Sequence, residues 1–228
     1  MGNSRPGFHQ PTRAELERDA LAVAPFLLGG ILCTRVDGAT VAVRITEVEA
    51  YHGRGTGPVP DPASHARMGR TARNATMWGE PGHLYVYLIH GIHSCVNVAC
   101  SPDGSASGVL LRAGEVIEGV DAATARRTTS RSPHDLARGP GRLGKALGMV
   151  SARHNGIDAL ADGAERAGMV ARLWLRDEPL REVATGPRVG VSGRAGTDAF
   201  PWRFWVPGDP TVSPFRPGRG AATVQPKG

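Results

Sequence analysis

Apolar residues recur along the chain at two spacings, one typical of helices and one typical of strands. Near the start, a capping box of Thr12 and Glu15 precedes a run of apolar residues at helical spacing, namely Leu16, Ala20, Val23 and Leu27. Apolar runs bounded by turn residues predict strands at 31–36, 40–51, 84–89, 95–99, 109–113, 170–175, 189–191 and 203–206. Further helices are predicted at 116–127 and 141–147.

The connections between these elements favour antiparallel pairing. Asp37-Gly38 lies between the first two predicted strands and is typical of a tight hairpin turn. The chain holds 31 glycines and 18 prolines, which is too many for an all-helical bundle. We therefore expect an α+β fold in which most strands are hairpin-linked and antiparallel.

Length and composition favour a single domain. The chain has 228 residues, of which 40% are hydrophobic, enough for a core. No window approaches a membrane span, and residues 1–10 lack the apolar stretch of a signal peptide. We expect a domain over residues 11–213, with disordered tails at 1–10 and 214–228. The cysteines, Cys33, Cys95 and Cys100, are expected to be reduced thiols in a cytoplasmic protein.

The charge of the chain suggests a polyanionic partner. Lys and Arg number 27 against 21 Asp and Glu, a net charge of +6. Between residues 126 and 153 only Asp135 is acidic, and the basic residues are Arg126, Arg127, Arg131, Arg138, Arg142, Lys145 and Arg153. Such a basic segment is typical of nucleic-acid binding. A solvated surface without a partner is the alternative.

The strand predicted at 40–51 carries carboxylates on a face that begins apolar. Unless a bulge intervenes, that face holds Val41, Val43, Ile45, Glu47, Glu49 and Tyr51. A carboxylate that continues an apolar face must lie at an opening or have partners, because its desolvation is costly. The pattern therefore indicates a carboxylate at the rim of a pocket beside Tyr51. The alternative is that both glutamates have left the core and are solvated.

The few aromatic residues concentrate in one part of the chain. The three tyrosines, Tyr51, Tyr85 and Tyr87, lie in the same region as five of the eight histidines. Tyr85 and Tyr87 alternate along one predicted strand, so both rings can project to one face. Such rings could sandwich a planar heterocycle, for example a base taken out of a duplex. An ordinary aromatic core cluster is the alternative.

A series of short motifs runs in order through the chain. It comprises Ile45-Thr46-Glu47-Val48-Glu49-Ala50-Tyr51, Ser64-His65-Ala66, Arg73-Asn74, Met77, Pro81-Gly82, Leu84-Tyr85-Val86-Tyr87, Gly91, Asn97, Leu110-Leu111-Arg112-Ala113, Gly139-Pro140-Gly141, Leu143, Ala146-Leu147, Arg188-Val189-Gly190 and Arg203-Phe204. Over about residues 15–213, this set resembles the alkyladenine (3-methyladenine) DNA glycosylase family, the one typified by the mammalian enzyme.

The resemblance implies a compact single domain around a curved, mostly antiparallel β-sheet with flanking helices. It also implies a monofunctional, monomeric enzyme that needs no cofactor or metal. Such an enzyme flips an alkylated or deaminated purine out of double-stranded DNA and hydrolyses its N-glycosidic bond, leaving an abasic site. The lesions implied are 3-methyladenine, 7-methylguanine, hypoxanthine and ethenoadenine. The protein would act in the cytoplasm on the bacterial nucleoid.

The family's site residues transfer to matching positions of this sequence. Glu49 matches the general base that activates water, and Arg112 matches a residue near that water and the phosphate of the target nucleotide. Tyr51 and Tyr87 match the rings that stack on the flipped base, with His65 opposite. The list is completed by Asn97, which matches the residue that crowds the 2-amino group of guanine.

One position departs from the family pattern. Mammalian members carry a tyrosine where this chain has His90, and that ring fills the gap left by the flipped nucleotide. His90 is therefore expected to be the wedge in the duplex, as a shorter flat ring that can also become cationic. Phosphate contacts are expected from the basic segment through Arg138, Arg142 and Lys145.

The residues themselves leave other functions to consider. A damage-recognition protein without catalysis would account for the charge and the rings, but would not require Glu49. A bifunctional lyase needs an amine nucleophile, and the chain has only two lysines. A metal enzyme is disfavoured because residues three apart on a strand face opposite sides. Its ligands would be His90, His93, Cys95 and Cys100.

Overall fold

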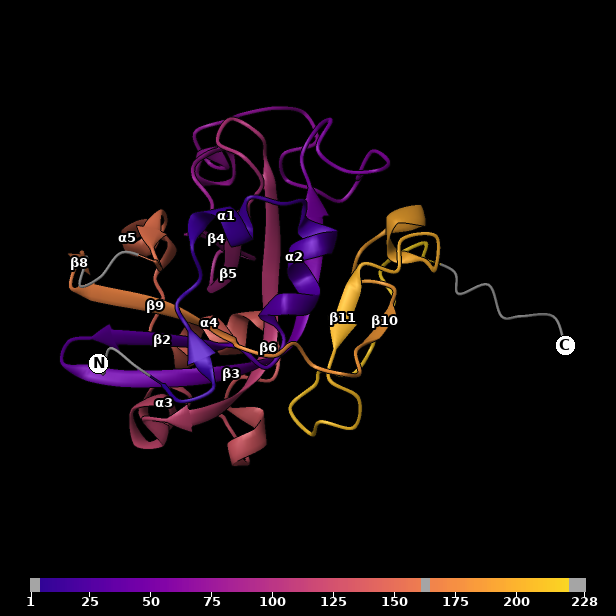
Figure 1. The fold of residues 1–228 in the computed structure, drawn as a ribbon. Coiled ribbons are helices and arrows are strands. Elements are labelled where there is room, and N and C mark those ends of the chain that lie inside the picture. Colours follow the sequence, from indigo (N-terminus) through magenta and orange to yellow (C-terminus); the bar gives the residue numbers. More distant parts are fainter. Residues whose placement is uncertain (1–4, 161–164, 222–228) are drawn as a thin grey trace, which may run out of the picture.

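A computed structural model describes residues 5–160 and 165–221 of the chain. Its strands form a curled sheet in the order β1-β9-β2-β3-β6-β5-β4-β7 (Figure 1). β8 pairs with β9, and β10 pairs with β11, which joins β3. All strand pairs of the described residues are antiparallel. The expected α+β fold around a curved antiparallel sheet is confirmed.

The elements have the following bounds. The strands are β1 (Phe8–His9), β2 (Ile31–Val36), β3 (Ala39–His52), β4 (His83–Ile89), β5 (His93–Cys100), β6 (Ser107–Glu118), β7 (Ile157–Asp158), β8 (Glu165–Arg166), β9 (Met169–Arg176), β10 (Ala184–Gly186) and β11 (Arg203–Trp205). The α-helices are α1 (Arg13–Leu16), α2 (Ala20–Leu27), α3 (Val120–Arg126), α4 (Pro140–Ala146) and α5 (Ser151–His154). Short 3-10 helices are η1 (Ala75–Trp78), η2 (Pro133–Asp135) and η3 (Gly193–Gly196).

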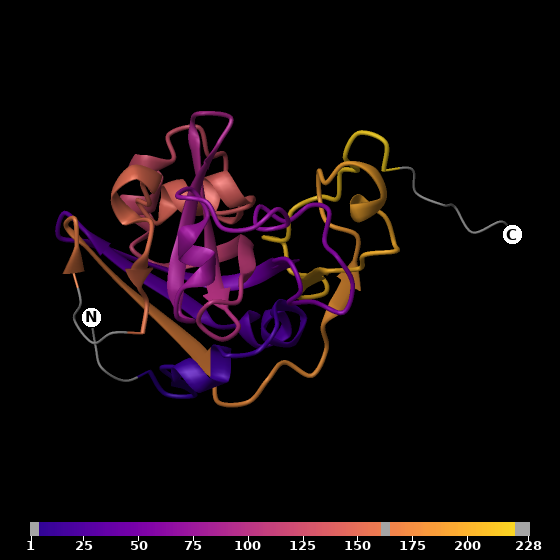
Figure 2. The ribbon, with the colours of Figure 1, turned by 90° about the horizontal axis from the view of Figure 1, so that it is seen from above.

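The helices flank the sheet in separate groups. α2 packs on β3, and α4 packs on β5 and β6. Seen from above, α3, α4 and α5 lie together on one side, whereas the segment 184–221 lies on the other (Figure 2). The main core fills the space between the sheet and α2, α3 and α4. Within the two described ranges, every helix is too short or too polar to cross a membrane.

The first predicted helix is split in two. α1 ends at Leu16, and a new helix begins at Ala20. The break arises because the Asp19 carboxylate caps α2, accepting hydrogen bonds from the N–H groups of Leu21 at 2.9 Å and Ala22 at 3.1 Å. An aspartate that caps a helix cannot also lie inside a longer one.

Two further local predictions are wrong. Residues 116–118 continue β6 instead of starting a helix, and α3 begins only after Gly119, where a Cβ would lie 1.9 Å from the Thr40 carbonyl oxygen. Residues 189–191 form no strand. There the N–H of Val189 donates to the side chain of Glu49, at 2.7 Å, rather than to a neighbouring strand.

The expected terminal tails are wrong for the parts that the structure describes. Phe8–His9 pairs with β9 as a short strand. At the other end, the Arg216 carbonyl accepts from Gly190 N–H at 2.8 Å, and the Arg219 carbonyl accepts from Gly193 N–H at 3.0 Å. Residues 1–4 and 222–228 lie outside the described ranges.

β3 changes its pairing partner halfway along. On one edge it pairs with β2 as far as Arg44 and with β11 from Glu47 to Glu49. At this changeover the register with β6, on the other edge, shifts between Ile45 and Glu47 and again between Glu47 and Val48. The buried core residues of β3 therefore move from odd to even positions, in the order Val41, Val43, Ile45, Val48 and Ala50.

This irregularity is the bulge that the sequence pattern left open. Glu47 and Glu49 do not continue the apolar face of β3; they face Arg112 of β6 on the side away from the main core. Tyr51 lies on the same side and donates a hydrogen bond to Glu49. The irregularity thus turns the polar side chains of one strand toward one site.

Glycine allows α4 to lie close against β5. A Cβ on Gly144 would lie 2.0 Å from the Ser94 carbonyl oxygen, and one on Gly141 would lie 2.9 Å from the Cβ of His93. This close approach seats the start of α4 beside the β4–β5 hairpin.

We expect Gly144→Ala to lower the free energy of unfolding by about 2 kcal/mol, because its methyl group meets backbone that cannot rotate away. Gly79→Ala is the matched control, since a Cβ there would contact only the Thr76 carbonyl oxygen, at 3.7 Å. Urea unfolding measures both variants. Equal stability of the two would contradict the close packing of α4.

His52 ends β3 in a fully buried position. Its ring lies 5.0 Å from that of Trp202, edge to face, and a Cβ on Gly57 would lie 2.5 Å from the ring. Among the described residues, neither ring nitrogen has a hydrogen-bond partner. Burial lowers the pKa of His52, against the opposing effect of Asp19 and Asp61. The neutral ring therefore packs against Gly57 in the loop that follows β3.

We expect stability to fall as the pH drops below about 6.5, the reference pKa of histidine. Above that pH, His52 is neutral in both states; below it, the unfolded chain takes up a proton that the folded chain resists. The loss amounts to at most about 1.4 kcal/mol per pH unit per histidine. In urea titrations from pH 7.5 to 5, His52→Phe should flatten the slope, whereas His134→Gln, at an exposed position, should not. Parallel slopes for wild type and His52→Phe would refute this account.

Candidate active site

Two carboxylates lie close together on β3 without contact with solvent. Glu47 and Glu49 are both 0% exposed, so the alternative of solvated glutamates is wrong. Glu47 accepts hydrogen bonds from Arg112 Nε at 3.0 Å and Arg203 Nε at 2.7 Å, and from Ser213 N–H at 2.8 Å and its hydroxyl at 3.0 Å. Glu47 therefore joins β3, β6, β11 and the C-terminal segment.

Glu49 has fewer partners, and all of them are donors. The Tyr51 hydroxyl donates to Oε2 at 2.8 Å, and the Val189 N–H donates to Oε1 at 2.7 Å. A terminal nitrogen of Arg112 lies 3.4 Å from Oε1, so this arginine bridges both glutamates. Burial opposes the charge of Arg112, but Glu49 and Glu47 raise its pKa. Because each carboxylate oxygen has two lone pairs, these donors do not exhaust the acceptor capacity of Glu49.

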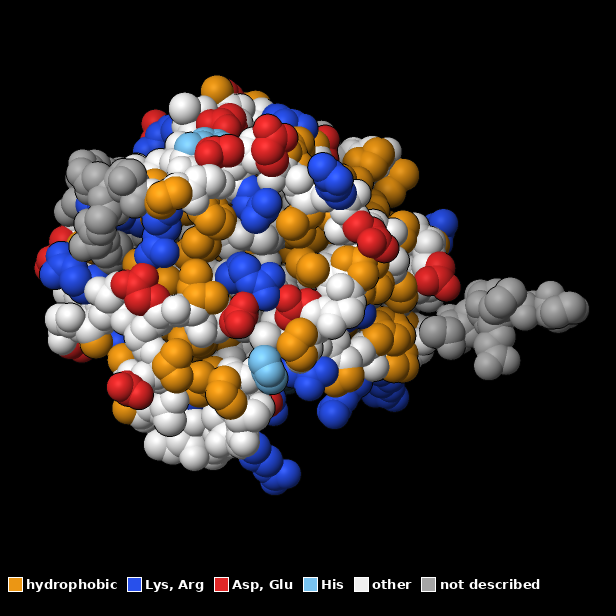
Figure 3. All heavy atoms as spheres, turned by 60° about the horizontal axis from the view of Figure 1, so that its bottom comes forward, with side chains coloured by type: hydrophobic (Ala, Val, Ile, Leu, Met, Phe, Trp, Pro, Cys, Tyr) orange, Lys and Arg blue, Asp and Glu red, His pale blue; other side chains and the backbone are white. Residues whose placement is uncertain are grey.

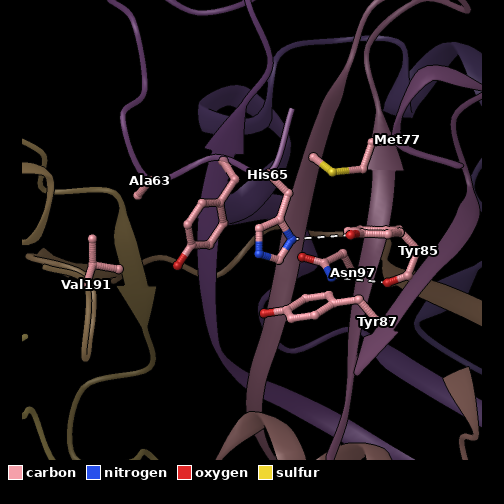
Figure 4. Close-up of a pocket in the computed structure, with 8 residues that line it drawn as sticks. Ala63, His65, Met77, Tyr85, Tyr87, Asn97 and Val191 are labelled. Carbon is pink, nitrogen blue, oxygen red and sulfur yellow. Dashed lines mark hydrogen bonds between the residues drawn. The ribbon is translucent and has the colours of Figure 1, made fainter. Parts of the chain in front are cut away.

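A cavity of about 80 Å³ lies beside Tyr51, and its walls are largely aromatic (Figure 4). It is lined by Tyr51, Ala63, His65, Met77, Tyr85, Tyr87, Asn97 and Val191. The cavity thus brings together the four residues predicted to form the pocket, Tyr51, His65, Tyr87 and Asn97. Glu49 does not line the cavity; it lies behind Tyr51, whose hydroxyl links the two.

The rings of this cavity are held in fixed contact. The His65 ring centre lies 4.5 Å from that of Tyr87, edge to face, and Tyr85 stacks on Tyr87 at 5.4 Å. His65 Nδ1 lies 3.2 Å from the Tyr85 hydroxyl, and Asn97 Nδ2 donates to the Tyr85 carbonyl at 3.1 Å. Burial, aided by Arg73, lowers the pKa of His65, so its ring is neutral at pH 7. Burial raises the pKa of Tyr87, which stays protonated.

The family resemblance did not assign Tyr85, Ala63, Met77 or Val191 to the pocket. The alternation of Tyr85 with Tyr87 along one strand does indicate that both rings can reach the same face. Ala63 and Val191 belong to loops, and their position depends on how those loops fold rather than on any local pattern.

A buried ion pair between two loops was also missed. Arg188 donates to both oxygens of Asp61, at 2.8 Å each, and both side chains are 0% exposed. The Arg188 guanidinium lies 4.5 Å from the centre of the Tyr51 ring. Asp61 also accepts from the N–H of Ala63 at 3.0 Å. The ion pair therefore fixes the loop that carries Ala63, a residue of the cavity wall. It also fixes Val189, the residue after Arg188, whose N–H donates to Glu49.

The proposed wedge lies at the tip of the β4–β5 hairpin. His90 is exposed and has a left-handed backbone, with φ 51°, followed by Gly91 at φ 72°. Its neighbours Leu88 and Ile92 are exposed apolar side chains. Tyr87 lines both the cavity and a separate groove along this hairpin.

The basic segment does not form one free basic surface. Several of its arginines bind within the protein: Arg126 donates to the Ala146 carbonyl, Arg127 to that of Leu136 and Arg138 to that of Val212, while Arg142 pairs with Asp135. Arg142 and Lys145 are exposed on α4. On the face shown in Figure 3, basic and acidic side chains are interspersed over the middle, and basic ones protrude along part of the lower edge.

The three cysteines are buried free thiols. Burial raises the pKa of Cys95 to about 11 and that of Cys100 to about 12, so both stay protonated at neutral pH. Across the residues that the structure describes, no cluster of three His, Cys, Asp or Glu side chains could hold a metal ion.

Comparison with known proteins gives one consistent result. Residues 14–210 match the model of the methylpurine-DNA glycosylase family. A protein of Nocardia farcinica is 50% identical over 215 residues, 92% of this chain and 95% of its own length. A Leifsonia xyli protein is 50% identical over 212 residues, 91% and 93% of the two chains. A Mycobacterium tuberculosis protein is 45% identical over 213 residues, 91% and 98%.

Each of these relatives carries the name "Putative 3-methyladenine DNA glycosylase". The family model covers most of the chain, and the relatives align over nearly their whole length. The chain therefore belongs to the methylpurine-DNA glycosylase family and is a DNA glycosylase, a hydrolase of N-glycosidic bonds.

Proposed function

We propose that this glycosylase flips alkylated and deaminated purines out of double-stranded DNA and excises them, leaving an abasic site. The substrate class comprises 3-methyladenine, 7-methylguanine, hypoxanthine and ethenoadenine. One observation carries the proposal: the buried carboxylate of Glu49, with donors only as partners, is hydrogen-bonded to Tyr51 of an aromatic cavity. No cofactor or metal takes part in the proposed reaction.

Glu49 is the general base of this proposal. Loss of a base from a nucleotide passes through an oxocarbenium-like state, which a nearby carboxylate stabilises while it deprotonates the attacking water. A free lone pair of Glu49 accepts the proton of that water. Arg112, 3.4 Å from Oε1, orients the carboxylate and approaches the phosphate of the target nucleotide.

The cavity holds the flipped base. Tyr51 and Tyr87 stack on the purine, with His65 across from them, and electron-rich rings favour a cationic alkylpurine by about 1 kcal/mol per good contact. Asn97, held by the Tyr85 carbonyl, crowds the 2-amino group of guanine. Unstacking costs a few kcal/mol and is least at damaged or mispaired sites, which adds selectivity.

The duplex is held by contacts outside the cavity. His90 fills the gap left by the flipped nucleotide, and Arg138, Arg142 and Lys145 contact phosphates without reading sequence. We propose that the enzyme acts as a monomer. Its relatives are bacterial proteins, so we place it at the nucleoid in the cytoplasm.

We expect Glu49→Gln to lower single-turnover excision by about 10²- to 10⁴-fold, the usual contribution of a general base. Glutamine can still accept from Val189 and contact Tyr51, so binding to a duplex with an abasic-site analogue should persist. A near wild-type rate would overturn the assignment of Glu49. Loss of excision with intact binding also separates catalysis from a purely damage-binding protein.

Glu47→Gln is the matched control at the neighbouring carboxylate. It removes the charge opposite Arg112 and Arg203, and breaking such a buried pair costs about 3–5 kcal/mol. Its main effect should therefore be a lower urea midpoint, whereas Glu49→Gln should keep a midpoint near that of the wild type.

We expect Asn97→Ser to raise excision of guanine-derived bases relative to adenine-derived bases, because the shorter side chain removes a steric block. The measurement is the ratio of single-turnover rates on 7-methylguanine and ethenoadenine in the same duplex. If that ratio equals the wild-type ratio, Asn97 does not select the base.

A further inference from the structure

A permanent positive charge lies behind the stacking ring of Tyr51. Arg188 has no exposed surface, and its guanidinium carbon lies 4.5 Å from the Tyr51 ring centre and 5.0 Å from that of Trp202. A guanidinium is charged at every physiological pH. The mechanism above does not use this charge.

The charge lies on the side of the ring away from the substrate. Tyr51 lines the cavity, whereas Arg188 does not line it and is fully buried. Arg188 covers one face of the Tyr51 ring and is itself fully buried, so a base in the cavity could stack only on the other face. A base stacked on Tyr51 would have a cation on the opposite face of the same ring.

A cation behind the Tyr51 ring changes the preference of that ring for a cationic over a neutral base. An aromatic face attracts a cation through its negative π cloud. A second cation held behind the ring repels a positively charged base across it, and the dry surroundings of Arg188 weaken this repulsion little. Asp61, bound at 2.8 Å to two guanidinium nitrogens, offsets part of this charge. A neutral base is not subject to this repulsion.

We propose that the Arg188–Asp61 pair sets the selectivity of the cavity between charged and neutral lesions, by reducing the advantage that its tyrosines give to cationic bases. In this role the pair keeps neutral lesions, such as hypoxanthine, competitive with 7-methylguanine and 3-methyladenine. The inference rests on the proposed function, in which the cavity binds the flipped base.

Geometry supports a fixed rather than an adaptable charge. Arg188 also donates to the carbonyls of Ala50, at 3.0 Å, and Ala195, at 3.3 Å. Asp61 accepts from the N–H groups of His52 at 3.2 Å and Ala63 at 3.0 Å. Both members are therefore held by backbone, and the charge cannot move away when a cationic base enters.

The test compares single-turnover excision of 7-methylguanine and hypoxanthine from the same duplex context. The double variant Arg188→Met/Asp61→Asn removes both charges at similar volume, which buried pairs often tolerate. We expect its ratio of 7-methylguanine to hypoxanthine rates to rise by about fivefold, the equivalent of about 1 kcal/mol of recovered cation–π attraction. Arg188→Lys is the matched control: it loses the two-point bond but keeps the charge, so its ratio should stay within about twofold of wild type.

For a second variant we expect the ratio of 7-methylguanine to hypoxanthine rates to change in the opposite direction. Asp61→Asn leaves the Arg188 charge without its partner, so the ratio should fall below that of wild type. Loss of positioning alone would slow excision of both lesions and leave the ratios unchanged. An unchanged or lower ratio in the double variant, or a rise in Asp61→Asn, would overturn the inference. Should one variant not fold, the other decides.

The proposed function fails by a different result. If wild type excises neither lesion, or if Glu49→Gln excises both at wild-type rates, the cavity is not the base site and the selectivity question does not arise. If wild type excises both and Glu49→Gln neither, but the ratios do not move as stated, only the role of Arg188–Asp61 is wrong.

Discussion

The site depends on the point at which β3 exchanges one neighbour for another. β3 pairs with β2 along its first half and with β11 along its second. At this change of neighbour its register with β6 shifts between Ile45 and Val48, and the shifts move the apolar face to even positions. Without these shifts, Glu47 and Glu49 would face the main core, where no charged partner could reach them.

The two glutamates then divide the work according to their partners. Glu47 accepts hydrogen bonds from two arginines and from both donors of Ser213. Its charge is therefore neutralised by contacts that join β3 to β6, β11 and the C-terminal segment. Glu49 accepts hydrogen bonds from one phenol and one backbone N–H, which leaves part of its acceptor capacity unused. Arg112 contacts both and so links Glu47 to Glu49, the proposed general base. Two identical side chains, two residues apart, thus differ only because their surroundings differ.

Local patterns predict the sheet well and the loops poorly. The Asp37-Gly38 hairpin and most strands follow from turn chemistry and apolar runs, because those signals act over a few residues. The pocket residues on strands, Tyr51, Tyr87 and Asn97, were found through the family resemblance. Asp61 and Arg188 were not, since they lie 127 residues apart and only the folded loops bring them together. The bulge in β3 could not be placed from the local pattern either, because it lies where β3 begins to pair with β11, a strand far along the sequence.

The order in which the chain is synthesised gives the Glu47–Ser213 contact a further consequence. Its members are 166 residues apart, and the Val189 donor to Glu49 comes 140 residues after it. A ribosome that has released the chain as far as β6 has made the central strands of the sheet, Tyr51 and Arg112. It has not yet made the donors from Val189, Arg203 and Ser213. Closing such long loops is slow and depends on the last part of the chain. The two carboxylates therefore gain their full set of donors only when the segment that carries Ser213 has left the ribosome.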